Sequence, residues 1–478
     1  MSRRTKIIAT IGPSSDDDES IIGLIEAGMD VARINTSHGT LEQHLHTYER
    51  LRSLSADAGK PLGILVDLPG PKVRCASFGE EGATLTEGDL ITVVSGDIGS
   101  TADRVEVQYE TLVADLRPGD RLAFGDGNVV AVVEDKDADA LKARVIFGGL
   151  LRGRPGLHIP SDRLRITAPT SDDLKLLDAF VEVGVDMVAL SFVRSAHDIR
   201  RLGVEPAPRG PLVIAKIETR AAVDNLDGII QASGAVMIAR GDLGAECPIE
   251  ELPHLQKEII EACIAHGRPA ITATQMLESM ISAPIPTRAE ASDVANAVFD
   301  GSSAVMLSGE TAIGRDPVAT VRTMARITER ADQEFDYEAW AKRIAILRSQ
   351  RSDDESEADR ITDSLTMAAW QVATQLKAKA ILCLSRTGFT VRSIARFRPT
   401  TPILGFSPDA FTVRQLALSW GAYPIKTIDR ATPGEMITDA LQLAHDQGGL
   451  RSGDLVVIVS GQSTKTRATD TLRVMRIP

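Results

Sequence analysis

A chain of 478 residues is too long for one ordinary hydrophobic core, so two to four domains are expected. Its 43% hydrophobic and 25% charged residues are typical of a soluble globular protein, and no apolar run reaches the roughly 18 residues that a membrane helix needs. The formal net charge of −13 argues against nucleic acid as the main partner, so an anionic substrate would need a local basic pocket.

Between residue 5 and about residue 310, short apolar runs alternate with segments that have the periodicity of amphipathic helices. The runs, which we expect to form eight strands, span residues 5–11, 31–35, 63–68, 185–192, 212–218, 235–242, 269–275 and 303–309. Nearly continuous apolar strands that alternate with helices are typical of a parallel sheet covered by helices. A doubly wound sheet is the alternative, but the count of eight favours a (β/α)8 barrel.

The stretch from residue 71 to residue 166 has a different pattern. Segments such as 84–94, 103–109 and 141–149 alternate on a two-residue period, with turn-type glycines and aspartates between them. This pattern predicts a small β-barrel domain inserted in one βα loop of the larger barrel. The active site of a (β/α)8 barrel lies at the C-terminal ends of its strands, so the insert would stand over that site as a lid.

The last part of the chain begins with one long predicted helix at about residues 317–347. A charge-rich segment at 348–360 follows, and its composition is typical of a solvated linker. From residue 361 helices again alternate with strands, which predicts a separate three-layer α/β domain. The predicted domains are the barrel at 1–70 and 167–345, the inserted β-barrel at 71–166 and the C-terminal α/β domain at 346–478.

Polar residues stand where the apolar strands end, at the edge of a barrel that carries the active site. Residues i and i+2 of a strand share a face, so Lys216 is expected to point with Glu218. By the same reasoning, Arg240 is expected to point with Asp242. The residues at these strand ends are Arg33, Asn35, Asp67, Lys216, Glu218, Arg240, Asp242, Thr272 and Thr274.

Two carboxylates on neighbouring strands form a hard oxygen site that suits Mg²⁺. Arg33, Arg74 and Lys216 around them would hold phosphate or carboxylate oxygens, so the set favours metal-assisted chemistry on a small phosphorylated acid. The alternative is that these charges form structural ion pairs at the barrel rim. The chain has neither a GxxxxGK[ST] loop nor a GxGxxG fingerprint, so a nucleotide would be bound without either device.

Seven motifs in order along the chain resemble those of the pyruvate kinase family. They are TKIIATIGPSS, VARINTSHG, AKIE, IARGDLG, TATQMLESM, PTRAEASDVANAVFDG and MLSGETA. The resemblance covers nearly the whole chain, including the β-rich insert. It implies Mg²⁺- or Mn²⁺-dependent phosphoryl transfer between phosphoenolpyruvate and ADP, which gives pyruvate and ATP in glycolysis.

The resemblance also implies roles for individual residues. Glu218 and Asp242 would hold the divalent metal, and Lys216 would neutralise charge on the phosphoryl group during transfer. Arg33 would bind the phosphate, and Thr274 would lie near the face on which the enolate is protonated. The implied catalytic residues are thus Lys216, Thr274 and Arg33, and the implied substrate-binding residues are Arg33, Lys216, Arg240, Gly241, Asp242 and Thr274.

The nucleotide side of the site would include the insert, which would close over the substrates and exclude water. Where many family members have a Lys-Gly-Val-Asn run before the return to the barrel, this chain reads RGRPGLHIP at 152–160. A proline replaces the lysine, and His158 replaces the asparagine. The residues implied to contact the nucleotide are Asn35, Ser37, His38, Arg74 and Arg154.

The segment VDLPGPKVR, at 66–74, bears on the need for K⁺. Many pyruvate kinases have threonine and glutamate at the positions of Leu68 and Lys72 and need K⁺, whereas members with leucine and lysine there work without it. The resemblance therefore implies that Lys72 is a built-in cation and that K⁺ is not required. The alternative is a solvated loop lysine. The groups that match the family's monovalent-cation site are Asn35, Ser37, Asp67 and the Leu68 carbonyl.

The C-terminal domain resembles the effector domain of the family. SRTGFT at 385–390 offers hydroxyls and amides at the start of a helix, where Ser385, Arg386, Thr387 and Thr390 would hold a sugar-phosphate effector. The alternative is an ordinary helix cap. The resemblance also implies a homotetramer. Four dispersed cysteines and no signal-peptide pattern at the start favour a cytoplasmic protein without membrane or nucleic-acid partners.

Two other functions stay open at the level of sequence. One is a Mg²⁺-dependent barrel aldolase that acts on pyruvate-like acids, which would need neither the lid nor the effector-like domain. The other is a non-catalytic regulatory homologue, which loss of Lys216, Glu218, Asp242 or Thr274 would have favoured; all four are present.

Overall fold

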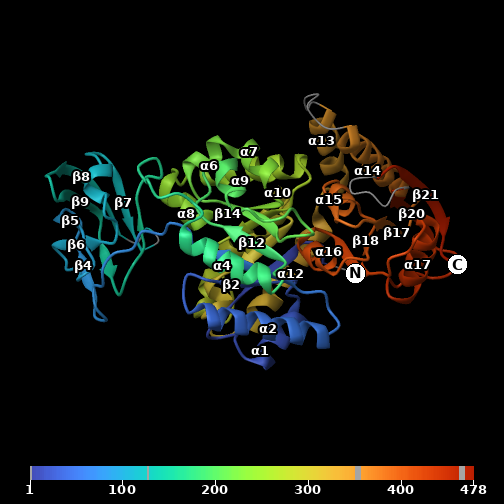
Figure 1. The fold of residues 1–478 in the computed structure, drawn as a ribbon, viewed down its shortest axis with the longest axis horizontal. Coiled ribbons are helices and arrows are strands. Elements are labelled where there is room, and N and C mark those ends of the chain that lie inside the picture. Colours follow the sequence, from blue (N-terminus) through green and yellow to red (C-terminus); the bar gives the residue numbers. More distant parts are fainter. Residues whose placement is uncertain (1–2, 126, 128, 350–356, 462–468) are drawn as a thin grey trace.

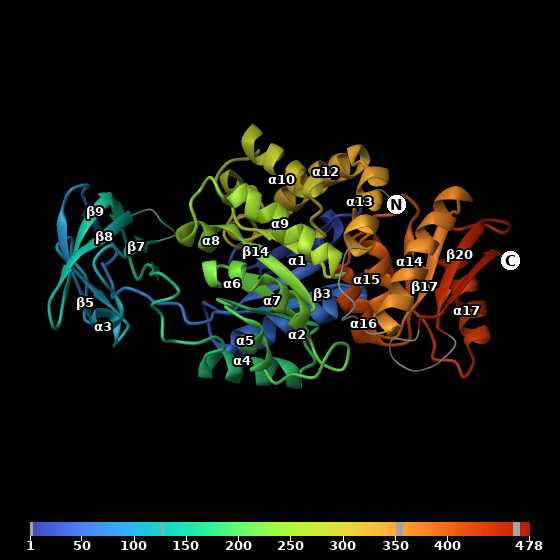
Figure 2. The same ribbon diagram turned by 90° about the horizontal axis from the view of Figure 1, so that it is seen from above.

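Three parts of the chain lie in a row. The computed structural model describes residues 3–125, 127, 129–349, 357–461 and 469–478, which leaves part of the predicted linker at 348–360 outside the described residues. A β-rich unit lies at one end, a barrel lies in the middle, and an α/β unit lies at the other end (Figure 1; Figure 2). None of the helices in the described ranges is both long and apolar enough to cross a membrane.

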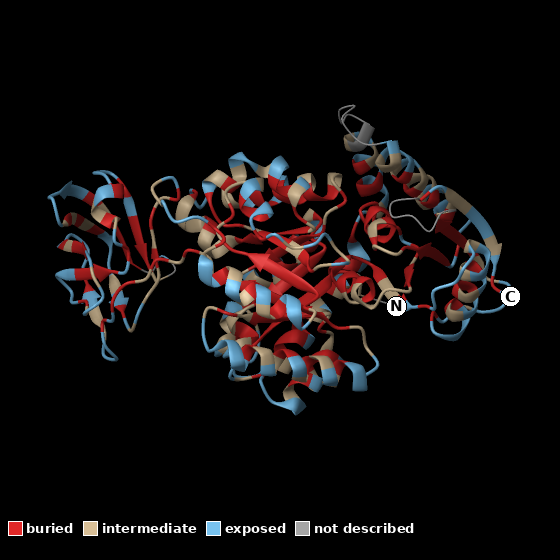
Figure 3. Ribbon diagram, viewed as in Figure 1, coloured by how far each residue is buried: buried red, intermediate tan, exposed pale blue. Residues whose placement is uncertain are grey.

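Eight parallel strands close into a barrel, which confirms the predicted fold class. Around the barrel they are β1 (Lys6–Ile11), β16 (Ala304–Leu307), β15 (Ala270–Ala273), β14 (Ala235–Ala239), β13 (Leu212–Ile217), β12 (Met187–Leu190), β3 (Gly63–Leu68) and β2 (Val31–Asn35). The strands are buried on both faces, and the exposed residues lie on the surrounding helices (Figure 3). Burial on both faces explains why the strands are nearly continuous apolar runs rather than alternating ones.

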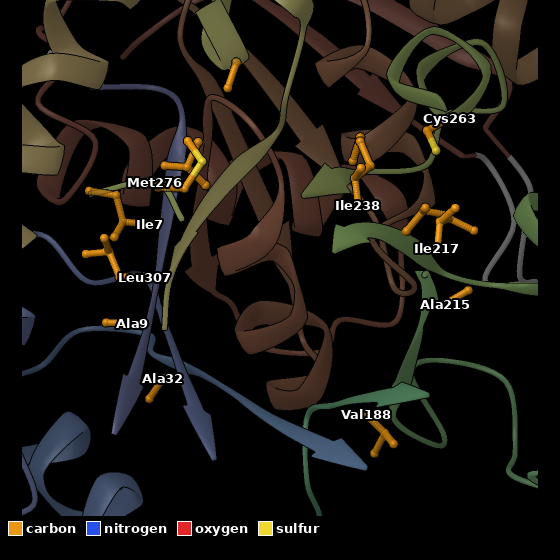
Figure 4. Packing of buried hydrophobic residues seen from close by; sticks show 14 of the residues in the cluster. Ile7, Ala9, Ala32, Val188, Ala215, Ile217, Ile238, Cys263, Met276 and Leu307 are labelled. Atoms are coloured by element: carbon orange, nitrogen blue, oxygen red, sulfur yellow. The ribbon is translucent and has the colours of Figure 1, made fainter. Parts of the chain in front are cut away.

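Successive strand residues contribute to two separate layers of core. Ile7 and Ala9 pack outward against the helices, together with Leu307 (Figure 4), whereas Ile8 packs inside the barrel. The helices of the barrel part are α1 (Asp18–Ala27), α2 (Leu41–Asp57), α4 (Ser171–Glu182), α5 (Ala196–Arg200), α6 (Arg220–Asp224), α7 (Leu226–Ala232), α8 (Arg240–Glu246), α9 (Leu252–Ala265), η1 (Glu278–Ile281), α10 (Arg288–Asp300), α11 (Gly309–Ala312) and α12 (Pro317–Glu334).

The prediction of a single long helix at 317–347 is wrong, because the chain forms α12 and then α13 (Tyr337–Ser349). Phe335 is extended, with ψ of 133°, and the Asp336 carboxylate accepts a hydrogen bond from the Ala339 amide at 3.0 Å. The ring of Phe335 packs on that of Trp340 with centroids 5.6 Å apart. A capping carboxylate, with apolar side chains in contact on either side of it, marks the start of a helix, so α13 is a separate helix.

The β-rich unit contains β4 (Ala83–Leu85), β5 (Leu90–Ser95), β6 (Arg104–Val107), α3 (Leu112–Asp115), β7 (Arg121–Phe124), β8 (Val129–Lys136), β9 (Leu141–Phe147), β10 (Gly149–Leu151) and β11 (Leu157–His158). Six strands form a sheet in the order β11-β7-β8-β9-β5-β6, and β10 pairs with β4. Arg74 bridges to Gly156 beside β11, and Cys75 bridges to Val107 of β6. The stretch that enters the unit thus joins its two edge strands around one hydrophobic core.

The C-terminal unit has three layers. Its sheet has the order β19-β18-β17-β20-β21, with only β21 antiparallel to its neighbour. Helices α14 and α15 pack on one face and α17 on the other. The elements are α14 (Glu357–Gln375), β17 (Ala380–Leu384), α15 (Phe389–Ala395), β18 (Ile403–Ser407), α16 (Ala410–Gln415), η2 (Leu416–Leu418), β19 (Ala422–Lys426), α17 (Pro433–Asp446), β20 (Leu455–Ser460) and β21 (Thr471–Arg476).

The C-terminal unit also completes the core of the barrel. Ala417 and Leu418 of η2 belong to the same buried cluster as Ile8 and Met187, which lie inside the barrel. Val31 and Leu212 of this cluster are first residues of their strands, so η2 closes the N-terminal end of the barrel. The opposite end, which faces the β-rich unit, is left for the candidate site.

Candidate active site

Basic and acidic side chains from three strands meet at the C-terminal end of the barrel. The Arg33 Nε donates to Asp67 Oδ2 at 2.7 Å, and its Nη1 donates to the hydroxyl of Thr10 at 2.9 Å. The Lys216 ammonium lies 3.3 Å from the other oxygen of Asp67 and 2.7 Å from Glu218 Oε1. The contact between Lys216 and Glu218 confirms that these two side chains share a face.

Ser191, directly after β12, joins two of these strands. Its hydroxyl accepts a hydrogen bond from Lys216 Nζ and donates one to the Leu68 carbonyl, both at 2.7 Å. The next residue, Phe192, has a φ of 54° and donates its amide to Glu218 Oε2 at 2.7 Å. A left-handed backbone is unfavourable for a bulky residue, and here it directs an amide to a carboxylate of the site.

The charges of this cluster shift the pKa values of its members. Burial would lower the pKa of Lys216, but Asp67, Glu218 and Asp242 outweigh burial and raise it, so the ammonium keeps its proton. Burial would raise the pKa of Asp67, but Lys216 and Arg33 hold it below its ordinary value. For Glu218, burial and the charge of Asp242 raise the pKa to about 7 in spite of Lys216.

Glu218 and Asp242 fit a divalent metal of the Mg²⁺ type. Glu218 Oε1 is buried, its nearest described cation is the Lys216 ammonium at 2.7 Å, and burial together with the charge of Asp242 raises the pKa of Glu218. The described residues hold no group of three or more acidic, histidine or cysteine side chains arranged for a metal. Mg²⁺ needs only one or two carboxylates when substrate oxygens complete its coordination, so a pair is sufficient.

The predicted common face of Arg240 and Asp242 is wrong. Arg240 is the first residue of helix α8, so the two-residue period of a strand does not apply there. The Arg240 guanidinium lies 2.7 Å from Asp293 Oδ2 and donates to the Thr274 carbonyl at 2.9 Å. Asp242 instead lies against the β-rich unit, where its Oδ1 is 3.2 Å from His158 Nε2.

Thr274 follows β15 and faces the start of α8. Its hydroxyl accepts the Gly241 amide at 2.9 Å and donates to the Ala273 carbonyl at 2.6 Å. Its φ is 66°, and that of Gln275 is 53°. A β-branched residue in the left-handed region is strained, and here the surrounding contacts hold the hydroxyl toward the site.

Lys72 lies at the junction of the barrel and the β-rich unit. Its Cε is 3.0 Å from the position that a Cβ on Gly156 would occupy, so the absent side chain of Gly156 gives the lysine its room. Burial lowers the pKa of His38, and the positive charges of Arg74 and Lys72 lower it further. The Lys72 ammonium makes no hydrogen bond or ion pair with any described residue.

The other residues expected on the nucleotide side are less closely grouped. Arg154 pairs with Asp97 inside the β-rich unit, and its carbonyl accepts the Arg74 guanidinium at 3.5 Å. Asn35 Oδ1 accepts the Ser37 amide at 3.3 Å. Thr36, which sequence reasoning did not single out, donates its hydroxyl to the Asp67 carbonyl at 2.7 Å, so this loop is tied to β3.

The residues expected to hold an effector phosphate lie around the start of α15. Arg386 pairs with Asp429, and the Thr390 hydroxyl lies 2.7 Å from that of Thr469. The Thr387 hydroxyl accepts the Phe389 amide at 3.4 Å, and Ser385 is buried. The hydroxyls of Thr387 and Thr390 therefore have protein partners in the structure, and the role of this set with an effector stays a prediction.

Sequence reasoning missed Ser191 and Thr10. Ser191 directly follows β12, and Thr10 is the next-to-last residue of β1, so the rule that identified Lys216 and Asp67 would also have found them. Thr10 holds Arg33 in place, because its hydroxyl accepts from Arg33 and donates to the Leu307 carbonyl at 2.8 Å. A small hydroxyl residue has little intrinsic signal, and only the contacts distinguish it from an ordinary strand residue.

Comparison with known proteins relates both the barrel part and the C-terminal part of the chain to one family. Residues 2–321 match the sequence model of the pyruvate kinase barrel domain, and residues 363–475 match that of the pyruvate kinase alpha/beta domain. The chain is 39% identical to a pyruvate kinase of Mycobacterium intracellulare, over 100% of this chain and 99% of that protein. It is 38% identical to a pyruvate kinase of Thermococcus litoralis over the same shares. It is 40% identical to pyruvate kinase 2 of Synechocystis over 96% of this chain and 77% of that protein.

Proposed function

Since the chain belongs to the pyruvate kinase family of phosphotransferases, we propose that it transfers a phosphoryl group from phosphoenolpyruvate to ADP with Mg²⁺ or Mn²⁺ at Glu218 and Asp242. One observation carries the proposal. The Lys216 ammonium lies 2.7 Å from Glu218, and burial together with the charge of a second acid, Asp242, raises the pKa of Glu218. A fixed cation next to a carboxylate pair provides both charges that phosphoryl transfer between anions needs.

A bound divalent metal would supply positive charge that offsets the negative charge of the phosphoryl group. Glu218 and Asp242 would hold it, and His158 would give up its contact with Asp242. Lys216 and Arg33 would bind the phosphoryl oxygens, with Asp67 keeping both cations in position. Because these groups are fixed before the substrate arrives, little reorganisation accompanies the reaction.

The carboxylate of the substrate would bind at the start of α8. The Gly241 amide, which donates to the Thr274 hydroxyl in the structure, would donate to this carboxylate, and the Thr274 hydroxyl would lie near the reacting face of the enolate. The role of Arg240 would be indirect, since its side chain points to Asp293 and holds the Thr274 carbonyl. The strained backbone of Thr274 would thus be maintained by contacts on the far side from the substrate.

The nucleotide would bind toward the β-rich unit. His38, Arg74 and Lys72 are grouped there, and Asn35, Ser37 and Arg154 would complete the nucleotide contacts. Closure of the β-rich unit would exclude water, so that the phosphoryl group reaches ADP rather than a hydroxide or water. The contact of His158 with Asp242 supports a closing motion, because the two units already meet at that point.

We further propose that Lys72 replaces a monovalent cation, so that the enzyme works without K⁺. Two observations support this. The Lys72 ammonium has no described counter-ion at the junction, and the same segment has Leu68 where K⁺-dependent members have threonine. A tethered ammonium supplies the positive charge that a bound ion would otherwise bring. The groups that match the family's cation site would then lie around the substrate held by Lys72 and would not bind K⁺. They are Asn35, Ser37, Asp67 and the Leu68 carbonyl.

The test is a coupled assay for pyruvate with phosphoenolpyruvate, ADP and Mg²⁺, in tetramethylammonium buffer with and without K⁺. We expect ADP-dependent pyruvate formation that changes less than about twofold on adding K⁺. The variant Lys72→Glu should lose activity in the absence of K⁺ and regain part of it when K⁺ is added. Absence of ADP-dependent pyruvate formation would refute the function, whereas an equal K⁺ requirement in both proteins would refute only the role of Lys72.

Regulation and assembly are finer parts of the proposal. A sugar phosphate would bind at Ser385, Arg386, Thr387 and Thr390, with the amides at the start of α15 turned toward its phosphate, and the protein would form a homotetramer in the cytoplasm. Sedimentation of the purified protein tests the tetramer. Activity at low phosphoenolpyruvate, compared between the wild type and Thr390→Ala across a panel of sugar phosphates, tests the effector.

A further inference from the structure

A small cavity lies between the N-terminal end of the barrel and the C-terminal unit. It is about 10 Å³ in volume, which is the space that one water molecule or one small ion needs. Four arginines contribute to its wall, from the loop before β15 and from α15 and the loop after it. The polar wall residues are Arg268, Arg392, Arg396, Arg398, Ser419 and Trp420.

Several polar groups of the wall have no hydrogen-bond partner among the described residues. They are Nε and Nη1 of Arg392, the Ser419 hydroxyl and the indole Nε1 of Trp420. The three residues are 7%, 1% and 2% exposed, so bulk water does not solvate these groups. Buried polar groups are nearly always satisfied, which indicates that something occupies the cavity.

The unpartnered groups are donors. Arginine and the tryptophan indole can only donate hydrogen bonds, and the serine hydroxyl can donate as well as accept. A single water molecule accepts at most two hydrogen bonds and has two protons of its own to place. An anion accepts from every side and has no proton, so it fits a wall of donors better than water does.

The charge around the cavity is also positive. Arg396 pairs with Asp363, but Arg392 and Arg398 have no ion pair among the described residues. Arg398 is held by the Ser302 carbonyl and stacks on the ring of Trp420 at 4.8 Å. Burial lowers the pKa of Arg392 to about 9, and the charge of Arg268 acts in the same direction. A bound negative charge would relieve this buried excess.

We propose that this cavity binds one small inorganic anion of halide size, held by the Arg392 guanidinium, Trp420 Nε1 and the Ser419 hydroxyl. The Arg392 guanidinium lies next to the loop at 385–390, because its Nη2 donates to the Thr387 carbonyl at 2.7 Å and its Nη1 is 2.8 Å from the position that a Cβ on Gly388 would occupy. The anion joins the C-terminal unit to the barrel at the end remote from the substrates. Its loss weakens that contact and leaves the chemistry unchanged.

Bromide, a heavier halide with an anomalous X-ray signal, locates the site directly. Crystals of the full-length protein soaked in bromide should show an anomalous peak in the cavity, and crystals of Arg392→Gln should not. The matched control is Arg209→Gln, which removes an exposed arginine whose side chain is 77% accessible and should keep the peak. A water molecule without anomalous signal in the wild-type cavity would overturn the proposal.

Thermal unfolding provides a second measurement that does not depend on crystals or on the variant folding well. At constant ionic strength, replacing gluconate by chloride should raise the Tm of the wild type by about 1–3 °C, because only the small anion fits the cavity and binds the folded state. The rise should remain in Arg209→Gln and vanish in Arg392→Gln. A Tm that does not change with the anion in the wild type would contradict the site.

Discussion

The two ends of the barrel bury charge in opposite ways. At the C-terminal end, Arg33 and Lys216 are balanced by Asp67 and Glu218, and a further acid, Asp242, lies beside them. At the N-terminal end, Arg398 lies among carbonyl groups and aromatic rings, Arg392 donates to the Thr387 carbonyl, and neither pairs with a described carboxylate. The C-terminal end therefore has an excess of carboxylate oxygens, and the N-terminal end has an excess of hydrogen-bond donors.

This difference shows that the burial of a charged side chain does not by itself identify its role. An ammonium between two carboxylates is held rigidly and stays charged, which suits stabilisation of a reacting phosphoryl group. A guanidinium stacked on rings and bonded to carbonyls mainly supports packing between two units of the chain. We therefore expect substitutions at the two ends to separate catalysis from stability.

The largest effect is expected from Lys216→Met, which removes the central cation of the C-terminal end. We expect kcat to fall by about 10³-fold or more, because charge that develops during transfer would no longer be stabilised. Steady-state kinetics with phosphoenolpyruvate, ADP and Mg²⁺ measure it. Lys175→Met, which changes an exposed lysine paired with Asp172, is the control and should keep its activity. A loss below tenfold would mean that the cluster is structural.

The reverse result is expected from Arg398→Met at the N-terminal end. It removes hydrogen bonds to the buried carbonyls of Val298 and Ser302, so the free energy of unfolding should fall by about 2–4 kcal/mol. Urea denaturation measures this loss, and Arg209→Met should show almost none. The kcat of the folded variant should stay within about twofold of the wild type; a large fall in kcat would break the proposed separation.

A smaller effect is expected from Ser191→Ala, which removes the link between Lys216 and the Leu68 carbonyl. We expect kcat to fall by about tenfold, with a change in KM for phosphoenolpyruvate below about threefold, because the ammonium loses its fixed position. Ser191→Thr should recover part of kcat, and the exposed Ser53→Ala should have no effect. A change in KM alone would assign Ser191 to substrate binding.

The smallest effect concerns pH and the carboxylates of the C-terminal end. The pKa of Glu218 is raised from 4.5 to about 7, so between these pH values the folded protein holds a proton that the unfolded chain releases. This group therefore lowers the free energy of unfolding as the pH rises toward 7 when no metal is present. Mg²⁺ should remove that contribution by taking the place of the proton.

Thermal unfolding from pH 5 to 7.5, with and without Mg²⁺, measures this contribution. We expect Mg²⁺ to raise the Tm by a few degrees more at pH 7.5 than at pH 5. In Glu218→Gln the benefit of Mg²⁺ should be small at every pH. A Mg²⁺ effect that is equal at both pH values in the wild type would contradict the raised pKa.

The sequence predicted which end of the barrel carries the candidate site because polar residues follow the apolar runs of its strands. Parallel strands end at the same edge, so Asp67 and Lys216 were expected at one end of the barrel even though their strands are distant in the chain. The same rule failed for Arg240, where the strand had already given way to α8. The domain boundaries and the roles of individual site residues stay predictions, since contacts alone do not test them.

The N-terminal end was not predicted, because nothing local to the sequence joins its parts. Arg268 precedes β15, whereas Arg392 and Trp420 belong to a unit that follows the barrel along the chain. They meet only because the C-terminal unit docks on the barrel. The break between α12 and α13 was missed for a related reason, since the apolar pattern continues across Phe335 and only the cap at Asp336 marks it.

The closure of the barrel by η2 has a consequence for the order in which the protein is made. The last barrel strand ends at Leu307, but Leu418, which fills the barrel interior from below, is synthesised much later. A nascent chain that has completed all eight strands still has an open apolar interior at one end. The barrel cannot reach its final stability on the ribosome until the C-terminal unit emerges, so truncation after residue 345 should yield a barrel that aggregates rather than a smaller enzyme.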